Sequence, residues 1–96
     1  MGSMTDPTSV PVYRQPAHDP LPGDRLRRTY RRGEYTDLVV TEFTAGLVYY
    51  RVENHYPGCA HVFQYLGHVD LIAWRQIATR GYSVVERAGE PEQEKP

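Results

Sequence analysis

Hydrophobic and polar residues alternate at a two-residue spacing through the centre of the chain. Two runs rich in β-branched and aromatic residues, 37–44 and 47–53, flank the dipeptide Ala45-Gly46. Such alternation places apolar side chains on one face of a strand, and a short glycine-containing link favours a tight turn. Residues 34–53 therefore predict a β-hairpin around which the rest of the chain is organised. The alternation in the first run is imperfect, which indicates either that both faces are covered or that a bulge shifts the phase.

Three further strands are predicted around the hairpin. Residues 25–30 and 82–87 show short apolar alternations, and residues 60–66 follow the turn signal Pro57-Gly58. The pattern does not indicate which face of the strand at residues 60–66 is buried, because each face carries apolar side chains.

The hydrophobic spacing changes to three and four residues within 70–80, where Leu71, Trp74 and Ile77 recur. That period predicts a helix, and Asp70 is a suitable N-cap. Trp74 is expected to be the main buried anchor of this helix. The predicted core consists of Leu26, Leu38, Val40, Val48, Tyr50, Val52, Phe63, Leu71, Trp74, Ile77 and Val84.

The two ends of the chain differ in composition from this body. Residues 5–22 contain five prolines and few large apolar side chains, and residues 89–96 are charged without any hydrophobe. Such segments bury too little apolar surface to offset the entropy lost on ordering. We therefore expect a disordered Pro-rich tail with a tag remnant over residues 1–22, one folded domain over 23–88, and a disordered acidic tail over 89–96.

Five short strands with one helix before the last strand is the element order of a small SH3-like barrel. Five-stranded barrels of the OB type are the competing architecture, but they usually carry their helix between the third and fourth strands. The sequence therefore predicts a mainly β domain: an SH3-like five-stranded barrel with one short helix.

Three short patterns resemble those of small phage and prophage proteins with SH3-like architecture. They are GDRL at 23–26, LVYYRVE at 47–53 and the Trp-Arg pair at 74–75. The resemblance implies the fold and a mobile-element context. Because most of those proteins have no assigned activity, it implies no catalytic residue.

Residues 23–88 contain nine arginines and no lysine. With seven carboxylates in the same range, their net charge is +2. So small a net charge is not that of a strong polyanion binder, but the planar guanidinium favours bidentate and stacking contacts. Five arginines and a tyrosine fall within residues 25–32, a pattern that favours phosphate contact and base stacking. The predicted nucleic-acid-binding residues are Arg25, Arg27, Arg28, Tyr30, Arg31, Arg32, Tyr49 and Arg51. The alternative for this cluster is a solvated edge strand whose charges prevent aggregation.

Tyrosine is abundant, with eight residues in the chain. Tyrosine and arginine are enriched at protein-interface hot spots, so a protein-interaction surface, in a homodimer or an inhibitor of a host protein, is the second hypothesis. The candidate residues are Tyr35, Tyr49, Tyr56 and Tyr82. The competing explanation is that tyrosines cap a small barrel core with their hydroxyls in water.

Four potential metal ligands, His55, Cys59, His61 and His68, lie close together in the sequence. They lack the paired cysteine spacing of structural zinc sites, and no local signature accompanies a cysteine–histidine nucleophile. We therefore expect a non-enzymatic binding module without a metal or cofactor.

The chain has a single cysteine, which excludes an intramolecular disulfide framework. The sequence shows neither a secretory hydrophobic segment nor an apolar run near the roughly 20 residues of a membrane span. These features predict a cytoplasmic protein.

Overall fold

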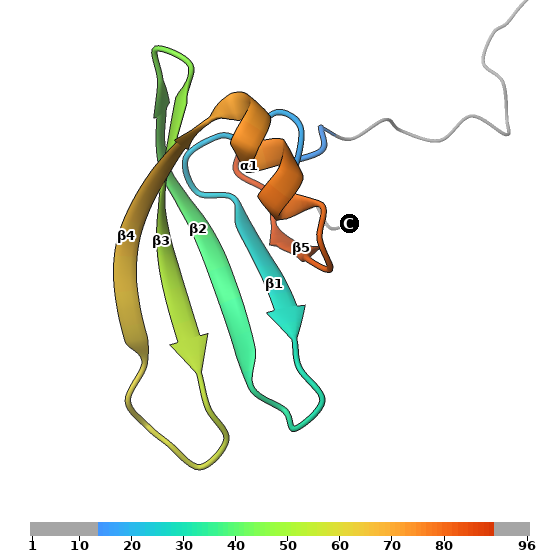
Figure 1. Ribbon diagram of the computed structural model, residues 1–96, viewed down its shortest axis with the longest axis vertical. Helices are drawn as coiled ribbons and strands as arrows, with labels where there is room; N and C mark the ends of the chain where they lie inside the picture. The colour runs from blue at the N-terminus through green and yellow to red at the C-terminus, as the bar shows by residue number, and fades with distance from the viewer. Residues whose placement is uncertain (1–13, 90–96) are drawn as a thin grey trace, which may run out of the picture.

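A computed structural model describes residues 14–89 and shows a five-stranded antiparallel sheet with one short helix (Figure 1). The strands lie in the order β4-β3-β2-β1-β5. The elements are β1 (Arg25–Thr29), β2 (Tyr35–Thr44), β3 (Leu47–His55), β4 (Phe63–Asp70), α1 (Leu71–Ala78) and β5 (Ser83–Glu86). The prediction of a mainly β domain with a helix before the last strand is confirmed.

The central hairpin forms as predicted. Its turn residues Ala45 and Gly46 have φ angles of 52° and 76°, the left-handed conformation that two-residue hairpin turns require. Register shifts between Val40 and Glu42, so a bulge interrupts the alternation of β2. Val39 is nevertheless buried on the face opposite Val40, so both explanations of the imperfect pattern apply.

Helix α1 begins where the sequence predicts. Asp70 is the N-cap, and its carboxylate accepts a hydrogen bond of 2.8 Å from the backbone N–H of Ala73. Trp74 is 0 % exposed and packs its ring against Tyr50, with centroids 5.6 Å apart. The helix is therefore held on the sheet by the anchor that its period indicates.

The core lies between α1 and one face of the sheet, which we call the helix-bearing face. Most predicted core residues are buried or packed against the buried cluster. Phe63 is an exception, because it is 49 % exposed. It occupies the start of β4 beyond the reach of α1, so its inclusion in the core was wrong. The buried hydrophobic cluster is Leu26, Leu38, Val40, Val48, Val52, Trp74 and Ala78.

The fourth strand runs over residues 63–70, later than the predicted 60–66, because the loop after Pro57-Gly58 is longer than a tight turn. It continues directly into α1. The whole of β4 pairs with β3. Phe63, which lies in the middle of the predicted strand, is therefore the first residue of β4.

Residues 14–22 pack on the domain, in contrast to the disordered tail expected through residue 22. Pro16 and Pro20 are buried, and the indole Nε1 of Trp74 donates a hydrogen bond of 2.9 Å to the carbonyl oxygen of Pro16. Asp24, fully buried, binds the Arg14 guanidinium through both carboxylate oxygens at 2.7 Å. The folded unit therefore begins before Gly23. The rest of that predicted tail, residues 1–13, and residues 90–96 lie outside the described range.

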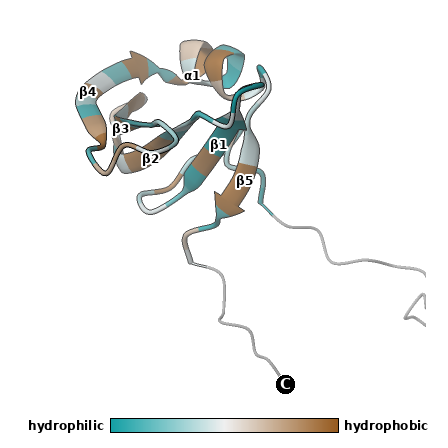
Figure 2. Cartoon of the chain, turned by 90° about the horizontal axis from the view of Figure 1, so that it is seen from below, coloured by the Kyte–Doolittle hydropathy of each residue, from teal (hydrophilic) through white to brown (hydrophobic). Residues whose placement is uncertain are grey.

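The sheet curves about α1, as the view from below shows (Figure 2). Within the described residues no pairing joins β4 to β5, so hydrogen bonds do not close the sheet into a barrel. No helix in residues 14–89 has the length and apolar character needed to span a membrane.

Candidate functional site

The face opposite α1, which we call the open face, carries a cluster of ion pairs. In the β1–β2–β3 register Arg27 lies opposite Asp37, which lies opposite Glu53. Asp37 Oδ1 accepts from Arg27 Nε at 2.7 Å and its Oδ2 accepts from Arg25 Nη1 at 2.7 Å. Arg25 and Arg51 donate to the two oxygens of Glu53 at 2.9 and 2.7 Å. Both carboxylates are buried beneath these guanidinium groups.

Ionisation of this cluster is fixed by the pairing. Burial alone would raise the pKa of Asp37, but hydrogen bonds from Arg27 and Arg25 outweigh it and lower the pKa. The pKa of Glu53 is lowered in the same way, against burial, by Arg25 and Arg51. The hydrogen bond to Asp37 raises the pKa of Arg25 and of Arg27 despite some burial. Asp37, Glu53, Arg25 and Arg27 are therefore charged at neutral pH.

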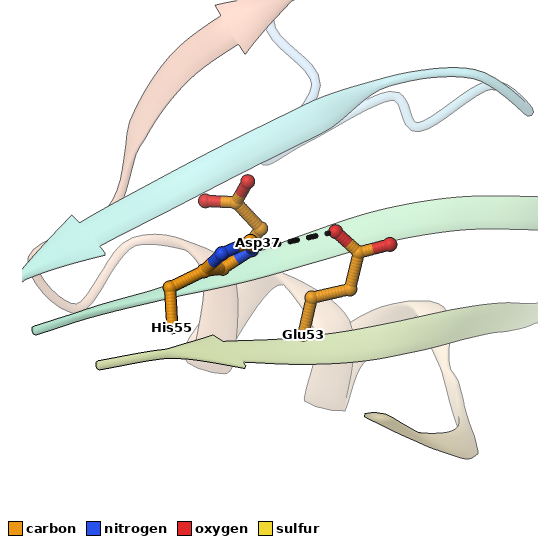
Figure 3. Close-up of side chains that lie close together, drawn as sticks. All are labelled: Asp37, Glu53 and His55. Carbon is orange, nitrogen blue, oxygen red and sulfur yellow. Dashed lines mark ion pairs between the residues drawn. The ribbon is translucent and has the colours of Figure 1, made fainter. Parts of the chain in front are cut away.

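His55 completes the cluster at the end of β3 (Figure 3). Its Nε2 lies 3.7 Å from Glu53 Oε1, and its ring stacks on Tyr35 with centroids 4.3 Å apart. The guanidinium carbon of Arg27 also lies over the Tyr35 ring, 4.0 Å from its centroid. One ligand atom each from Asp37, Glu53 and His55 lies within 4.8 Å of the others. A cation there would face three guanidinium groups already bonded to those carboxylates, so the donor set does not fit a metal.

The ion pairs divide the predicted nucleic-acid-binding set. Arg25, Arg27 and Arg51 lie on the open face, where they form ion pairs with the buried Asp37 and Glu53 and, in the case of Arg25, with the exposed Glu86. Tyr49 is also on the open face, at the other end of β3, where it stacks on His68 at 5.3 Å. The structure therefore does not bring these four residues together with the remaining four.

Arg28 lies on the helix-bearing face, because it is two residues from the buried Leu26 in β1. The strand register places Arg28 opposite Thr36, Thr36 opposite Asn54, and Asn54 opposite Phe63. This row crosses four strands below the part of the sheet that α1 covers (Figure 1). The helix-bearing face therefore has an uncovered half.

Tyrosine rings gather around Arg28 on this uncovered half. Its guanidinium carbon lies 5.3 Å from the centroid of Tyr30. Burial raises the pKa of Tyr82, the nearby hydroxyls of Tyr30 and Tyr65 add to the rise, and Arg28 opposes it. Tyr30, Tyr65 and Arg28 are thus close enough to Tyr82 to influence its ionisation, although Tyr65 comes from β4 and Tyr82 from the segment before β5.

A second group of rings continues the surface across the β3–β4 connection. Phe63 contacts Tyr56 and His61 edge-on, with ring centroids 5.7 and 4.5 Å apart. Tyr56 and Tyr30 line one pocket of about 230 Å³. Exposed rings thus extend from β1 to β4.

We call this set the aromatic surface. It consists of Arg28, Tyr30, Tyr56, Phe63, Tyr65 and Tyr82. Arg31 and Arg32 adjoin it in the turn after Tyr30. Within residues 14–89 the guanidinium groups of Arg28, Arg31 and Arg32 have no carboxylate partner at ion-pair distance.

The predicted protein-binding tyrosines do not share one face. Tyr35 and Tyr49 lie on the open face in ring stacks, whereas Tyr82 and Tyr56 belong to the aromatic surface. Sequence analysis missed Tyr65, whose 59 % exposure reflects its place on β4 beyond the helix. The alternation of residues 60–66 contained this signal but could not say which side was covered.

The four metal-ligand candidates do not converge within the described residues; they are His55, Cys59, His61 and His68. Cys59 is exposed and its Sγ lies 3.6 Å from the backbone oxygen of His61. His55 and His68 stack on different tyrosines, on the open face. Within residues 14–89, three potential metal ligands come together at Asp37, Glu53 and His55. Of the four candidate ligands predicted from the sequence, this group contains His55 alone.

No protein-family model, no curated protein and no solved structure matches this chain. The resemblance to phage-type proteins therefore stays a prediction, and the chemistry of the two faces is the basis for any functional conclusion.

Proposed function

We propose that this domain is a non-enzymatic module that binds single-stranded nucleic acid on the aromatic surface. The observation that carries the proposal is that Arg28, which has no carboxylate partner in the described chain, lies beside the exposed ring of Tyr30 on a surface that also exposes Tyr56, Phe63 and Tyr65. Bases of any sequence can stack on aromatic rings, and guanidinium groups form charged hydrogen bonds to the phosphates that link the bases.

Single strands fit this surface better than duplexes do. Each exposed ring offers a face to an unstacked base, whereas bases inside a duplex are already stacked on each other. Arg31 and Arg32 directly follow Tyr30 in the turn between β1 and β2 and add positive charge next to the rings. The ion-paired arginines of the open face contribute little, because their three charges are matched by Asp37, Glu53 and Glu86.

The proposal includes the finer fold prediction. In an SH3-like barrel the last strand pairs with the first, and the strands run as β5-β1-β2-β3-β4 across the curved sheet. The pairing of β1 with both β2 and β5 supports this assignment. The phage or mobile-element context remains part of the proposal on the strength of the sequence resemblance alone.

Fluorescence anisotropy with labelled single- and double-stranded DNA and RNA tests the proposal. We expect tighter binding to single strands, weakening as salt rises with a slope of about 0.7 per phosphate contact. Arg28→Gln should weaken binding several-fold and lower that slope, whereas Arg51→Gln removes the same charge from the open face and should change affinity little. Tyr65→Ser should weaken binding with little change in the salt slope.

Two results would contradict nucleic-acid binding here. Absence of binding at low salt excludes it, because electrostatic attraction is strongest there. Equal effects of the Arg28 and Arg51 substitutions would show that only net charge matters and that the aromatic surface is not the site.

Protein interaction is the second candidate function, and a specific feature favours it. The edge strand β4 carries large exposed apolar side chains on both faces, Tyr65 on one and Leu66 on the other. Such an edge is a site where another strand can add to a sheet.

A further inference from the structure

Strand β4 forms one edge of the sheet and lacks the devices that usually protect an edge. Within the described residues it pairs with β3 alone. Its sequence, FQYLGHVD, contains no lysine, arginine or proline, and its single carboxylate is Asp70 at the very end. Charged or proline residues normally keep such an edge from pairing with another chain.

The side chains of β4 are unusually exposed for apolar residues. Leu66 is 77 % exposed on the open face, and Tyr65 is 59 % exposed on the helix-bearing face. Solvent-exposed hydrophobes on a free edge mark a surface that is stabilised by being covered.

We propose that β4 pairs with β4 of a second copy of this chain, so that two five-stranded sheets form one continuous antiparallel sheet. A two-fold axis normal to the sheet makes every contact self-complementary. It also keeps both helix-bearing faces on the same side. Because α1 follows the C-terminal end of β4 directly, antiparallel pairing puts the two helices at opposite ends, where they do not collide.

The register that best covers the exposed side chains centres on Leu66. Leu66 of one copy then lies opposite Leu66 of the other, and Tyr65 lies opposite Gly67, each pair sharing a face. Gly67 has no side chain, and the ring of Tyr50 occupies the space above it, so that Tyr65 of the other copy would adjoin Tyr50. The remaining pairs are Gln64 with His68 and Phe63 with Val69, and none opposes like charges.

The area available predicts a weak, concentration-dependent association. A buried aromatic side chain hides roughly 150–250 Å², and about half of each β4 ring is exposed. Two copies would therefore cover several hundred square ångströms of side chain, less than the roughly 1,200 Å² typical of stable complexes. Main-chain hydrogen bonds along the strand add to this contact.

Sedimentation equilibrium over a wide concentration range, without nucleic acid, tests the proposal. We expect the wild type to associate as concentration rises. Leu66→Lys and Leu66→Asp each place like charges opposite one another and should weaken association at least about tenfold. An equimolar mixture of the two variants should restore association, because the charges opposed at the axis are then opposite in sign.

Ile72→Lys is the matched control. Ile72 is 68 % exposed but lies on α1, so this variant makes the same charge change off the strand and should associate like the wild type. A wild type that stays monomeric at every concentration overturns the proposal and leaves β4 to a strand of another protein. Association that survives both single Leu66 substitutions, or a mixture that fails to restore it, also overturns it. Leu66 lies on the open face, so its substitution leaves every residue of the aromatic surface in place, although Tyr65 belongs to both proposed contacts. Because association is measured without nucleic acid, its failure is distinguishable from a failure of nucleic-acid binding.

Discussion

The indole of Trp74 donates its Nε1 hydrogen to the carbonyl oxygen of Pro16, across 2.9 Å and 58 residues of chain. Both residues are fully buried. The bond ties α1 to the segment before β1, and Arg75 on the same helix donates to the carbonyl oxygen of His18. A proline-rich stretch is thus part of the domain because its carbonyl groups satisfy donors from the helix.

Trp74→Phe is expected to lower the free energy of unfolding by about 1–3 kcal/mol, because the buried Pro16 carbonyl loses its donor. Trp74→Ala should cost about 3–5 kcal/mol, since the cavity adds to that loss. Urea unfolding followed by circular dichroism measures both. Tyr50→Phe is the control: it trims a ring beside Trp74 whose hydroxyl has no hydrogen bond to the described residues. Equal stability of Trp74→Phe and wild type would show that the bond to Pro16 contributes nothing.

Asp24 joins three parts of the chain that are distant in sequence. Its carboxylate accepts hydrogen bonds from Arg14 and from the backbone N–H groups of Leu21 and Ala88. Asp24→Asn removes the buried carboxylate that binds Arg14 through both of its oxygens, and we expect a loss of about 3–5 kcal/mol in urea unfolding. Asp19→Asn serves as the control, since Asp19 is exposed and its ion pair is long, so its effect should stay below about 0.5 kcal/mol.

Local sequence patterns predicted the strands and helix well, whereas contacts distant in sequence escaped them. The hairpin and α1 follow from residue spacing and caps, which are properties of neighbouring residues. The docking of residues 14–22 depends on Trp74, which lies far along the chain, and composition alone therefore suggested a tail. Phe63 was placed in the core because its strand is apolar on both faces, and only the position of α1 decides which part is covered.

The candidate site was predictable in composition but not in arrangement. Residues Arg25 and Arg28 are three apart in one strand, so they point to opposite faces, as the period of two requires. The register of β1, β2 and β3 decides that Arg25 pairs with the buried Asp37 and Glu53. Counting charges along the sequence could not show that three arginines are neutralised and three others are not.

The hairpin turn contains a residue whose replacement should stabilise the protein. Ala45 has a φ of 52°, a left-handed conformation that costs an alanine roughly 1 kcal/mol. Ala45→Asn should raise the melting temperature, because asparagine tolerates this conformation and Asn-Gly favours such turns. Gly46→Ala should lower it: an added Cβ meets no atom within 4 Å, and the cost comes from the backbone at a φ of 76°. A melting temperature unchanged in both variants would count against this turn geometry.

The buried ion pairs of the open face should make stability depend on acid pH. The folded-state pKa values of Asp37 and Glu53 are lowered, so the stability that they contribute is present above their unfolded values of about 4. It is lost as pH falls through the lower folded-state values. We expect the free energy of unfolding from urea titrations to be nearly constant between pH 7 and about pH 5 and to fall below that.

Substitution of one carboxylate separates this cluster from general acid effects. Asp37→Asn removes the shared partner of Arg25 and Arg27 and should destabilise the protein by about 3–5 kcal/mol at pH 7. Its deficit relative to wild type should shrink as pH falls, because the wild-type carboxylate then becomes protonated and loses its pairing as well. Glu42→Gln changes an exposed carboxylate and should follow the wild-type profile. If the difference in unfolding free energy between Asp37→Asn and wild type stays constant from pH 7 to pH 3, ionised Asp37 does not stabilise the protein through its arginine pairs.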